Sequence, residues 1–174
     1  MRYWLFKSEP NSFSFDDLRA EPNQTTGWDG VRNYQARNFL RDDVHSGDLV
    51  LFYHSNAEPA VIAGIAEVVG EAEPDPTAFD PKSKYFDPKS NPDLPVWFQV
   101  AIRAVRSVNP PLSLHLLRSR PELAEMELLR KGSRLSVQPI RKNEWDAIMR
   151  LIDADTQSQP SQPRTLRKRS QGTK

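Results

Sequence analysis

The sequence predicts an α+β fold: a mixed, barrel-like sheet of about five to six strands surrounded by short helices. The apolar runs are too short for helices, and the helical segments fall between them without the regular alternation of a doubly wound fold. A chain of 174 residues suits one ordinary domain. We therefore expect a domain over residues 1–153 and a basic, disordered tail over residues 154–174.

The N-terminal segment predicts a strand and a short helix. Residues 3–8 are an aromatic and apolar run that ends at the turn signal Glu9-Pro10, which indicates a first strand. Ser14 and Asp17 have the spacing of a capping box, so a short helix is expected to end near Ala20.

The next segment predicts a loop, a helix and a hairpin. Residues 25–30 have loop composition, and residues 32–41 show helical spacing with an apolar face. Residues 49–53 form a continuous apolar run, and residues 60–69 follow it across a turn, so the two are expected to pair as a β-hairpin.

Residues 71–95 contain six prolines and a local repeat, and they predict a long loop that is either functional or a stiff connector. Residues 96–105 alternate apolar and polar side chains, as a half-buried strand does. Two short helices are then expected within residues 112–129, a strand over 135–138 and a terminal helix over 142–152.

Composition excludes several function classes. The chain has no cysteine, so disulfides, thiolate metal clusters and cysteine nucleophiles are impossible. Neither GxGxxG nor GxxxxGK[ST] occurs, and no HExxH-type spacing is present, so we expect no nucleotide cofactor and no metal. A Ser/His/acid triad built on His54 and Ser55 is disfavoured, because adjacent strand residues point to opposite faces. The protein is predicted not to be an enzyme.

Charge and hydropathy suggest where the protein acts. Residues 1–153 hold 19 Lys/Arg against 22 Asp/Glu, a balance of −3, whereas residues 154–174 hold five against one, a balance of +4. No run of about 18 apolar residues and no secretory signal pattern are present. We expect a cytoplasmic protein without a membrane partner, and a monomer.

Aromatic rings beside small polar groups occur at three predicted element ends. Trp4 precedes Lys7-Ser8-Glu9, Trp28 precedes Asn33-Tyr34, and Tyr53 precedes His54-Ser55. A flat ligand needs this combination, because rings stack on its face while polar groups bond its edge. The alternative is that these aromatic residues are simply core.

Four segments resemble the hallmark segments of the EVE domain family, of the PUA-like superfamily. They are Trp4–Pro10, the block WDGVRNYQARN over Trp28–Asn38, Phe52–Ser55 and Arg134–Pro139. The resemblance spans residues 3 to about 152 and implies a PUA-like mixed β-barrel. It also implies a noncatalytic module that reads a modified base, of the 5-methylcytosine type, flipped out of nucleic acid, with DNA favoured over RNA.

The resemblance implies roles for the residues already singled out. Trp28 with Tyr34 or Tyr53 would stack on the base, and Glu9 would accept from an exocyclic amine. Asn33, Ser55 and Ser136 would bond the remaining edge. Lys7 and Arg32 would meet flanking phosphates, with Arg37 and Arg41 in the same basic patch. The complete set of ligand-binding residues comprises Lys7, Ser8, Glu9, Trp28, Arg32, Asn33, Tyr34, Tyr53, His54, Ser55 and Ser136.

Three alternatives stay open at this level. The first is an enzyme acting on a modified base, such as a glycosylase, because flipping is common to readers and base-modifying enzymes. The second is a module that reads modified RNA. The third is a protein-interaction adaptor that works through its tail.

Overall fold

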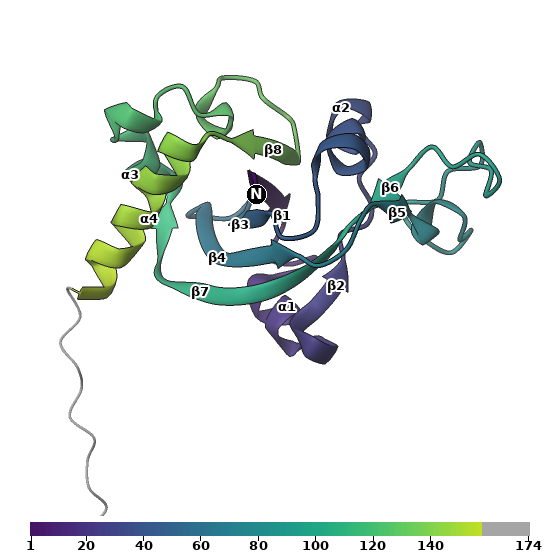
Figure 1. Cartoon of the computed structure of the whole chain (residues 1–174), viewed down its shortest axis with the longest axis horizontal. Helices are drawn as coiled ribbons and strands as arrows, with labels where there is room; N and C mark the ends of the chain where they lie inside the picture. The colour runs from purple at the N-terminus through teal and green to yellow at the C-terminus, as the bar shows by residue number, and fades with distance from the viewer. Residues whose placement is uncertain (158–174) are drawn as a thin grey trace, which may run out of the picture.

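The chain folds around a mixed sheet of six strands that curls into a half barrel, with a few short helices around it (Figure 1). The structure is a computed structural model, and it describes residues 1–157. The sheet order is β2-β7-β4-β3-β1-β8, and only β1 and β3 are parallel. The strands are β1 Tyr3–Ser8, β2 Thr25–Gly27, β3 Leu49–His54, β4 Val61–Val68, β7 Ala101–Ser113 and β8 Val137–Ile140. The predicted α+β, barrel-like class is confirmed.

The helices are short except for the last one. They are α1 Phe15–Ala20, α2 Tyr34–Asn38, α3 Leu114–Arg118 and α4 Lys142–Gln157, and a π-helical turn Phe39–Asp43 continues α2. None of the helices in residues 1–157 is long and apolar enough to cross a membrane. The predicted capping box is present at α1, where the Asp17 amide donates to Ser14 Oγ at 3.1 Å and the Ser14 amide donates to Asp17 Oδ2 at 2.7 Å.

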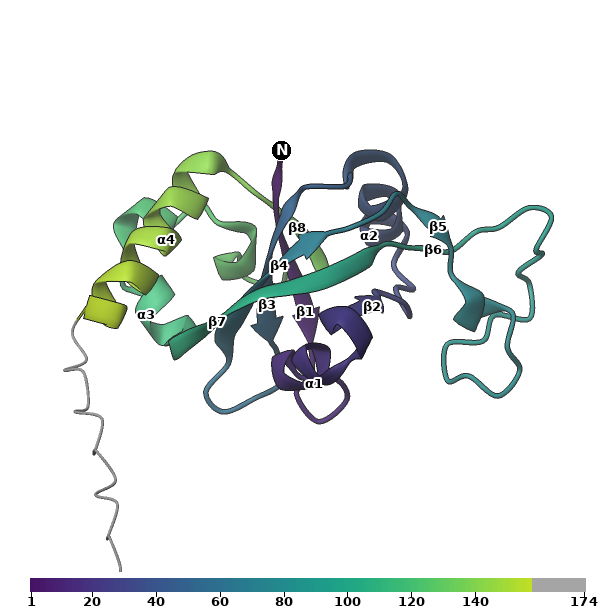
Figure 2. The ribbon, with the colours of Figure 1, turned by 60° about the horizontal axis from the view of Figure 1, so that its bottom comes forward.

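Two cores lie on the two faces of the sheet. Along β1, Trp4 and Phe6 point into one core and Leu5 into the other, as alternation along a strand requires. The first core is covered by α1 and α2, the second by α3 and α4. Figures 1 and 2 both show α3 and α4 together at one end of the sheet, away from α1 and α2.

Strand direction brings several predicted site residues to one edge. Because β1 and β3 are parallel, their C-terminal ends meet, and the Ser55 amide donates to the Ser8 carbonyl at 2.9 Å. Because β8 is antiparallel to β1, it begins at the same edge, and the Lys7 amide donates to the Ser136 carbonyl at 2.8 Å. Residues 7–9, 55 and 136 are therefore neighbours although they are far apart in the chain.

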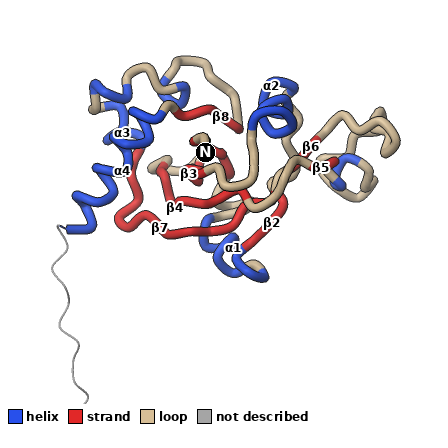
Figure 3. The backbone as a smooth tube through the Cα atoms, in the orientation of Figure 1, coloured by secondary structure: helices blue, strands red, loops and turns tan. Residues whose placement is uncertain are grey.

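The long loop projects away from the sheet (Figures 2 and 3). It begins and ends in a small second sheet of β5 Glu73–Pro74 and β6 Phe98–Gln99 and contains one 3₁₀ turn, Pro76–Ala78. The two copies of the repeat form the same turn: the Lys82 amide donates to Asp80 Oδ1 at 2.9 Å, and the Lys89 amide donates to Asp87 Oδ1 at 3.0 Å.

Several predicted boundaries in the first half are wrong. The expected loop over 25–30 contains β2, which pairs with β7. The helix expected from residue 32 begins at Tyr34, because Asn33 adopts an extended conformation and caps it.

The C-terminal half also departs from prediction. The strand expected over 96–105 is interrupted at Val100 and then runs on to Ser113 as β7. Pro110 and Pro111 do not end it, because they lie where its register with β4 shifts between Ile62 and Gly64. Only α3 of the two expected helices is α-helical; the second is replaced by 3₁₀ turns, Pro121–Leu123 and Glu127–Leu129.

The last two elements are displaced from their expected bounds. The strand expected over 135–138 lies two residues later, as β8, and the terminal helix continues to Gln157. The prediction of a disordered tail covers residues 154–174. Of these, residues 158–174 lie outside the described residues.

Candidate functional site

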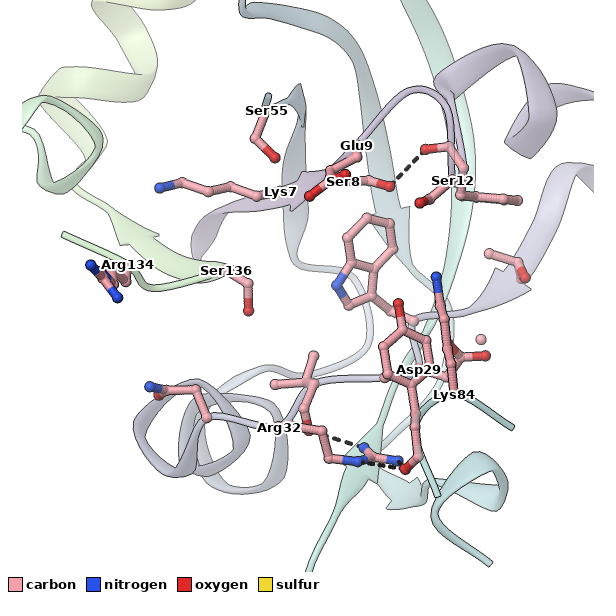
Figure 4. Close-up of a pocket in the computed structure, with 18 residues that line it drawn as sticks. Lys7, Ser8, Glu9, Ser12, Asp29, Arg32, Ser55, Lys84, Arg134 and Ser136 are labelled. Atoms are coloured by element: carbon pink, nitrogen blue, oxygen red, sulfur yellow. Dashed lines mark hydrogen bonds between the residues drawn. The ribbon is translucent and has the colours of Figure 1, made fainter. Parts of the chain in front are cut away.

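A cavity of about 750 Å³ opens at the edge where β1, β3 and β8 meet, and the segment between β2 and α2 closes its other side (Figure 4). The structure brings predicted site residues from four separate segments to this cavity. They are Lys7, Ser8, Glu9, Trp28, Arg32, Asn33, Ser55 and Ser136. The strand directions described above explain why residues 7–9, 55 and 136 meet, and the segment between β2 and α2 adds the other three residues.

The other three predicted residues do not line the cavity. Tyr53 is 3% exposed and points into the core on the opposite face of β3, below α3 and α4. His54 Nε2 accepts a hydrogen bond from the Phe15 amide at 3.1 Å and thereby holds the start of α1. Tyr34 is 63% exposed and packs against Trp97, with 5.0 Å between the ring centroids. None of the three side chains lines the cavity as predicted.

Trp28 is both core and cavity wall. Its ring packs against Phe6 and Phe52 at centroid distances of 5.2 and 5.3 Å, and the side chain is buried. Its backbone amide donates to the Val100 carbonyl at 2.7 Å. The indole N–H has no hydrogen-bond partner within residues 1–157. Trp28 therefore offers the cavity part of its ring and one free donor, and the expectation that it is core is also correct.

Tyr85, which sequence reasoning missed, supplies a second aromatic wall. It comes from the long loop and lies against Gly30, whose φ is +73°. A Cβ added at residue 30 would lie 2.5 Å from Tyr85 Cε2, so the ring occupies the space a side chain would need. The Lys84 ammonium lies 4.8 Å from the centroid of the same ring. The loop thus contributes directly to the cavity.

Arg32 ties that loop to the cavity wall. Its Nε and Nη2 donate to the Tyr85 carbonyl at 2.9 and 2.6 Å. Its Nη1 donates to the carboxylate of Asp75 at 2.7 Å and to the Val31 carbonyl, and Nη2 also reaches Thr77 Oγ1. All five N–H groups of the guanidinium are therefore used within the protein. The structure gives Arg32 a positioning role, and the predicted contact with phosphate has no free donor to make it.

We call the contacts of Arg32 with Tyr85 and Asp75 the clamp. Within it, Asp75 is fully buried. Burial opposes its ionisation, but hydrogen bonds from Thr77, Arg32 and the Gly30 amide outweigh that effect and lower its pKa. The same carboxylate thus fixes the Gly30 backbone and the Arg32 guanidinium.

The remaining arginines of the predicted basic patch are also engaged. Arg37 donates to the Val96 carbonyl and to Asn38 Oδ1, the latter at 2.8 Å. Arg41 pairs with Asp42 at 2.6 Å. Three cations line the cavity and make no side-chain hydrogen bond in the described part of the chain: Lys7, Lys84 and Arg134. Burial lowers the pKa of Lys7, and Glu127 partly offsets this.

Two carboxylates line the cavity. Glu9 Oε1 accepts from Asn56 Nδ2 at 2.7 Å, which leaves its second oxygen available. Asp29, which sequence reasoning also missed, makes no hydrogen bond within residues 1–157. Burial raises the pKa of Asp29 and the nearby Asp75 charge adds to this, against the opposite influence of Arg32 and Lys84.

The small polar side chains complete the lining. Asn33 Oδ1 caps α2 by accepting from the Ala36 amide at 3.0 Å. Its side-chain nitrogen makes no hydrogen bond within residues 1–157, so both of its N–H groups can donate to a ligand. Ser8 Oγ donates to the Phe13 carbonyl at 2.7 Å. The hydroxyls of Ser55 and Ser136 make no hydrogen bond within the described residues and line the cavity (Figure 4). No group of three or more His, Asp or Glu side chains in residues 1–157 is placed to hold a metal ion.

Comparison with known proteins identifies the family. The EVE domain family model matches residues 2–151. Human thymocyte nuclear protein 1 is 42% identical over 170 residues, which cover 88% of this chain and 75% of that protein. Among solved structures, a Pseudomonas syringae protein is 45% identical with a TM-score of 0.82, over 86% of this chain and 99% of that one.

A second solved structure adds a ligand. It is described as human THYN1 protein in complex with 5-methylcytosine containing DNA, and it is 40% identical with a TM-score of 0.83 over 88% of this chain and 98% of that one. The YTH domain of Mmi1, at 13% identity and a TM-score of 0.53, shares the fold alone. The resemblance noted in the sequence is confirmed: the chain belongs to the EVE domain family.

Proposed function

We propose that this chain is a noncatalytic binding module that takes a modified base of the 5-methylcytosine type, flipped out of DNA, into the cavity. The observation that carries the proposal is the cavity itself, which combines two aromatic walls with unpartnered polar groups. Its volume of about 750 Å³ lies in the range of small-molecule sites. The DNA complex of the human relative supports the same ligand class.

The aromatic walls suit the flat face of a base. The Tyr85 ring packs against Gly30, and Arg32 holds the Tyr85 backbone through two hydrogen bonds to its carbonyl. Trp28 forms another part of the wall. A base inside a duplex is inaccessible to such a cavity, so binding requires that the base leave the stack. We propose that Tyr85 and Trp28 contact the face of the flipped base.

The polar groups suit the edge of cytosine. Cytosine presents one exocyclic amine as donor and two acceptors on its pairing edge. Asp29 and the free oxygen of Glu9 are acceptors for the amine, and neither needs to break a hydrogen bond within the described residues. The Asn33 amide, the Trp28 N–H and the hydroxyls of Ser55 and Ser136 are donors for the other two positions. A Lys7 contact with a flanking phosphate completes the proposal.

A fluorescence-anisotropy titration tests this function. The full chain is titrated against matched single- and double-stranded DNA carrying cytosine, 5-methylcytosine or 5-hydroxymethylcytosine, and against matched RNA. We expect a modified DNA strand to bind more tightly than its unmodified twin. Equal affinity for all strands would refute the proposal, and preference for modified RNA would assign the site to RNA instead.

The absence of turnover is part of the proposal and has its own test. The same complexes are incubated and analysed by chromatography for free base. We expect the DNA to be recovered intact, whereas release of the modified base would show that the cavity is an active site with Asp29 or Glu9 as acid or base.

The proposal also includes a monomeric state and a cytoplasmic location. Analytical ultracentrifugation of the full chain checks the first, with a single species at the mass of one chain expected. Cell fractionation checks the second.

A further inference from the structure

A second, smaller cavity of about 410 Å³ lies beside the first one. The two cavities share the lining residues Asn33 and Arg134 and are therefore adjacent. The second cavity is formed mainly by residues 130–135, the turn that precedes β8. We call this turn the basic turn.

The basic turn concentrates positive charge. Arg130, Lys131 and Arg134 line the second cavity together with a single carboxylate, Glu127. Arg130 pairs with Glu127 at 2.9 Å. Lys131 and Arg134 are exposed and have no hydrogen bond or ion pair within residues 1–157. Two uncompensated cations therefore stand together on a domain whose residues 1–153 have an excess of acidic side chains.

The basic turn is held in place by the protein beneath it. Ser133 Oγ donates to Glu127 Oε1 at 2.7 Å, and the buried Gln138 side chain donates to the Leu135 carbonyl at 3.0 Å. The Ser133 amide donates to the Arg130 carbonyl at 3.3 Å, and Gly132 adopts a φ of +82° between them. Lys131 and Arg134 are thus presented from a turn whose backbone is anchored on both sides.

The other rim of the first cavity is different. There Arg32 is used in contacts within the protein, and Lys84 of the long loop is the cation without a hydrogen bond in residues 1–157. The basic turn presents two such cations together, Lys131 and Arg134, so it offers a polyanion a pair of adjacent positive charges.

We propose that Lys131 and Arg134 bind the phosphodiester backbone of the strand whose flipped base occupies the first cavity. This inference rests on the proposed function, and it adds the path that the strand takes away from the cavity. Arg134 lines both cavities and would contact the phosphate next to the flipped nucleotide, while Lys131 would contact a phosphate further along. These contacts carry affinity, whereas sequence and modification are read by the base cavity.

The first experiment measures affinity and its salt dependence for Lys131→Ala, Arg134→Ala and the double variant of the full chain. Each lost phosphate contact should reduce the slope of log K against log salt by about 0.7 to 0.9, which at physiological salt corresponds to about four- to fivefold weaker binding. Lys131→Ala should weaken binding to 5-methylcytosine and cytosine strands by the same factor. Arg150→Ala, which removes an exposed cation on α4, is the matched control and should leave the slope unchanged.

The second experiment locates the contact on the strand. Two consecutive linkages on the 5′ or the 3′ side of the modified base are replaced by uncharged methylphosphonates. If Lys131 and Arg134 bind these phosphates, the variants should lose no further affinity once the phosphates are neutral. On one of the two sides, the neutral linkages should therefore abolish the loss of affinity caused by Lys131→Ala and Arg134→Ala. That outcome on either side supports the proposal. Unchanged effects of the variants with both modified strands would overturn it.

Failure of this inference is distinguishable from failure of the proposed function. If the wild type prefers the modified strand but Lys131→Ala and Arg134→Ala behave like Arg150→Ala, the basic turn has no role and the reader function stands. If the wild type binds all strands equally, the proposed function is refuted whatever the variants do.

Discussion

The ring of Tyr85 packs against Gly30, so close that a Cβ at residue 30 would be 2.5 Å from the Cε2 atom of the ring. Gly30 also has a φ of +73°, a conformation that side chains disfavour. The two residues are 55 positions apart in the chain. This contact joins the long loop to the WDGVRNYQARN block and forms one wall of the cavity.

Gly30→Ala should therefore damage binding more than stability. The left-handed backbone costs about 1 to 2 kcal/mol for any L side chain, and the new methyl group must also displace Tyr85. We expect affinity for a 5-methylcytosine strand to fall about tenfold or more while the fold is retained. The matched control is Gly47→Ala, because Gly47 has a φ of +87° and nothing within 4 Å of an added Cβ. Similar affinities for the two variants would contradict the role of the Tyr85 contact.

Arg32→Ala should destabilise the domain strongly. It leaves the Asp75 carboxylate buried without its cation, and breaking a buried pair in this way costs about 3 to 5 kcal/mol. Urea unfolding of Arg32→Ala and of Arg41→Ala measures the difference. Arg41 and Asp42 form an exposed pair, whose loss should cost about 1 kcal/mol or less. Equal losses of unfolding free energy in the two variants would show that the buried pair of Arg32 and Asp75 stabilises the domain no more than the exposed pair does.

The affinity for a cytosine-type base should depend on the ionisation of Asp29. The carboxylate must be ionised to accept two hydrogen bonds freely, and burial raises its pKa. Affinity is thus expected to fall as the pH is lowered through this raised pKa, above the range of an ordinary aspartate. Asp29→Asn should flatten the profile, whereas Glu9→Gln should retain it. A wild-type profile that is already flat over that range would exclude Asp29 as the acceptor.

His54 should make stability depend on pH. Burial lowers its pKa, although Asp16 and Asp17 act in the opposite direction. The unfolded chain therefore binds a proton at higher pH than the folded chain does. The His54 contribution is fully present above the ordinary value of 6.5 and is lost as the pH falls from there through the lowered pKa.

The variant His54→Gln separates this effect from that of other groups. Glutamine keeps an acceptor for the Phe15 amide, which His54 Nε2 now binds at 3.1 Å. Urea unfolding at pH 8 and pH 5 should show a smaller loss of stability for His54→Gln than for the wild type. Equal losses would mean that His54 does not titrate in this way.

Local patterns predicted the elements that local rules control. The capping box at Ser14 and Asp17, the hairpin of β3 and β4 and the first strand all follow from short-range signals, and the structure contains them. The extent of β7 could not be predicted locally. Its prolines fall in a register shift, and that shift exists only because β4 is its partner.

In the candidate site, too, local patterns predict some residues, and others are placed only by contacts between distant parts of the chain. The residues at the ends of β1 and β3 follow from small polar groups beside aromatic rings, whereas Ser136, before β8, follows from the family resemblance. Strand direction brings them together. Tyr85 has no such local signal, because it reaches the cavity only through contacts of Arg32 and Gly30. The prediction for Tyr53 is wrong, because an aromatic residue at a strand end can point to either face of the sheet and only the packing against α3 and α4 decides which.

The central claim is that the cavity reads a flipped base through Tyr85, and one titration with two tyrosine variants tests it most directly. Tyr85 lines the cavity, whereas Tyr34 is exposed outside it. Loss of stacking costs about 1 to 3 kcal/mol per base. Tyr85→Ala should therefore bind a 5-methylcytosine strand at least about fivefold more weakly and lose the preference over cytosine, while Tyr34→Ala keeps both. If Tyr34→Ala loses the preference and Tyr85→Ala retains it, the base does not bind in this cavity.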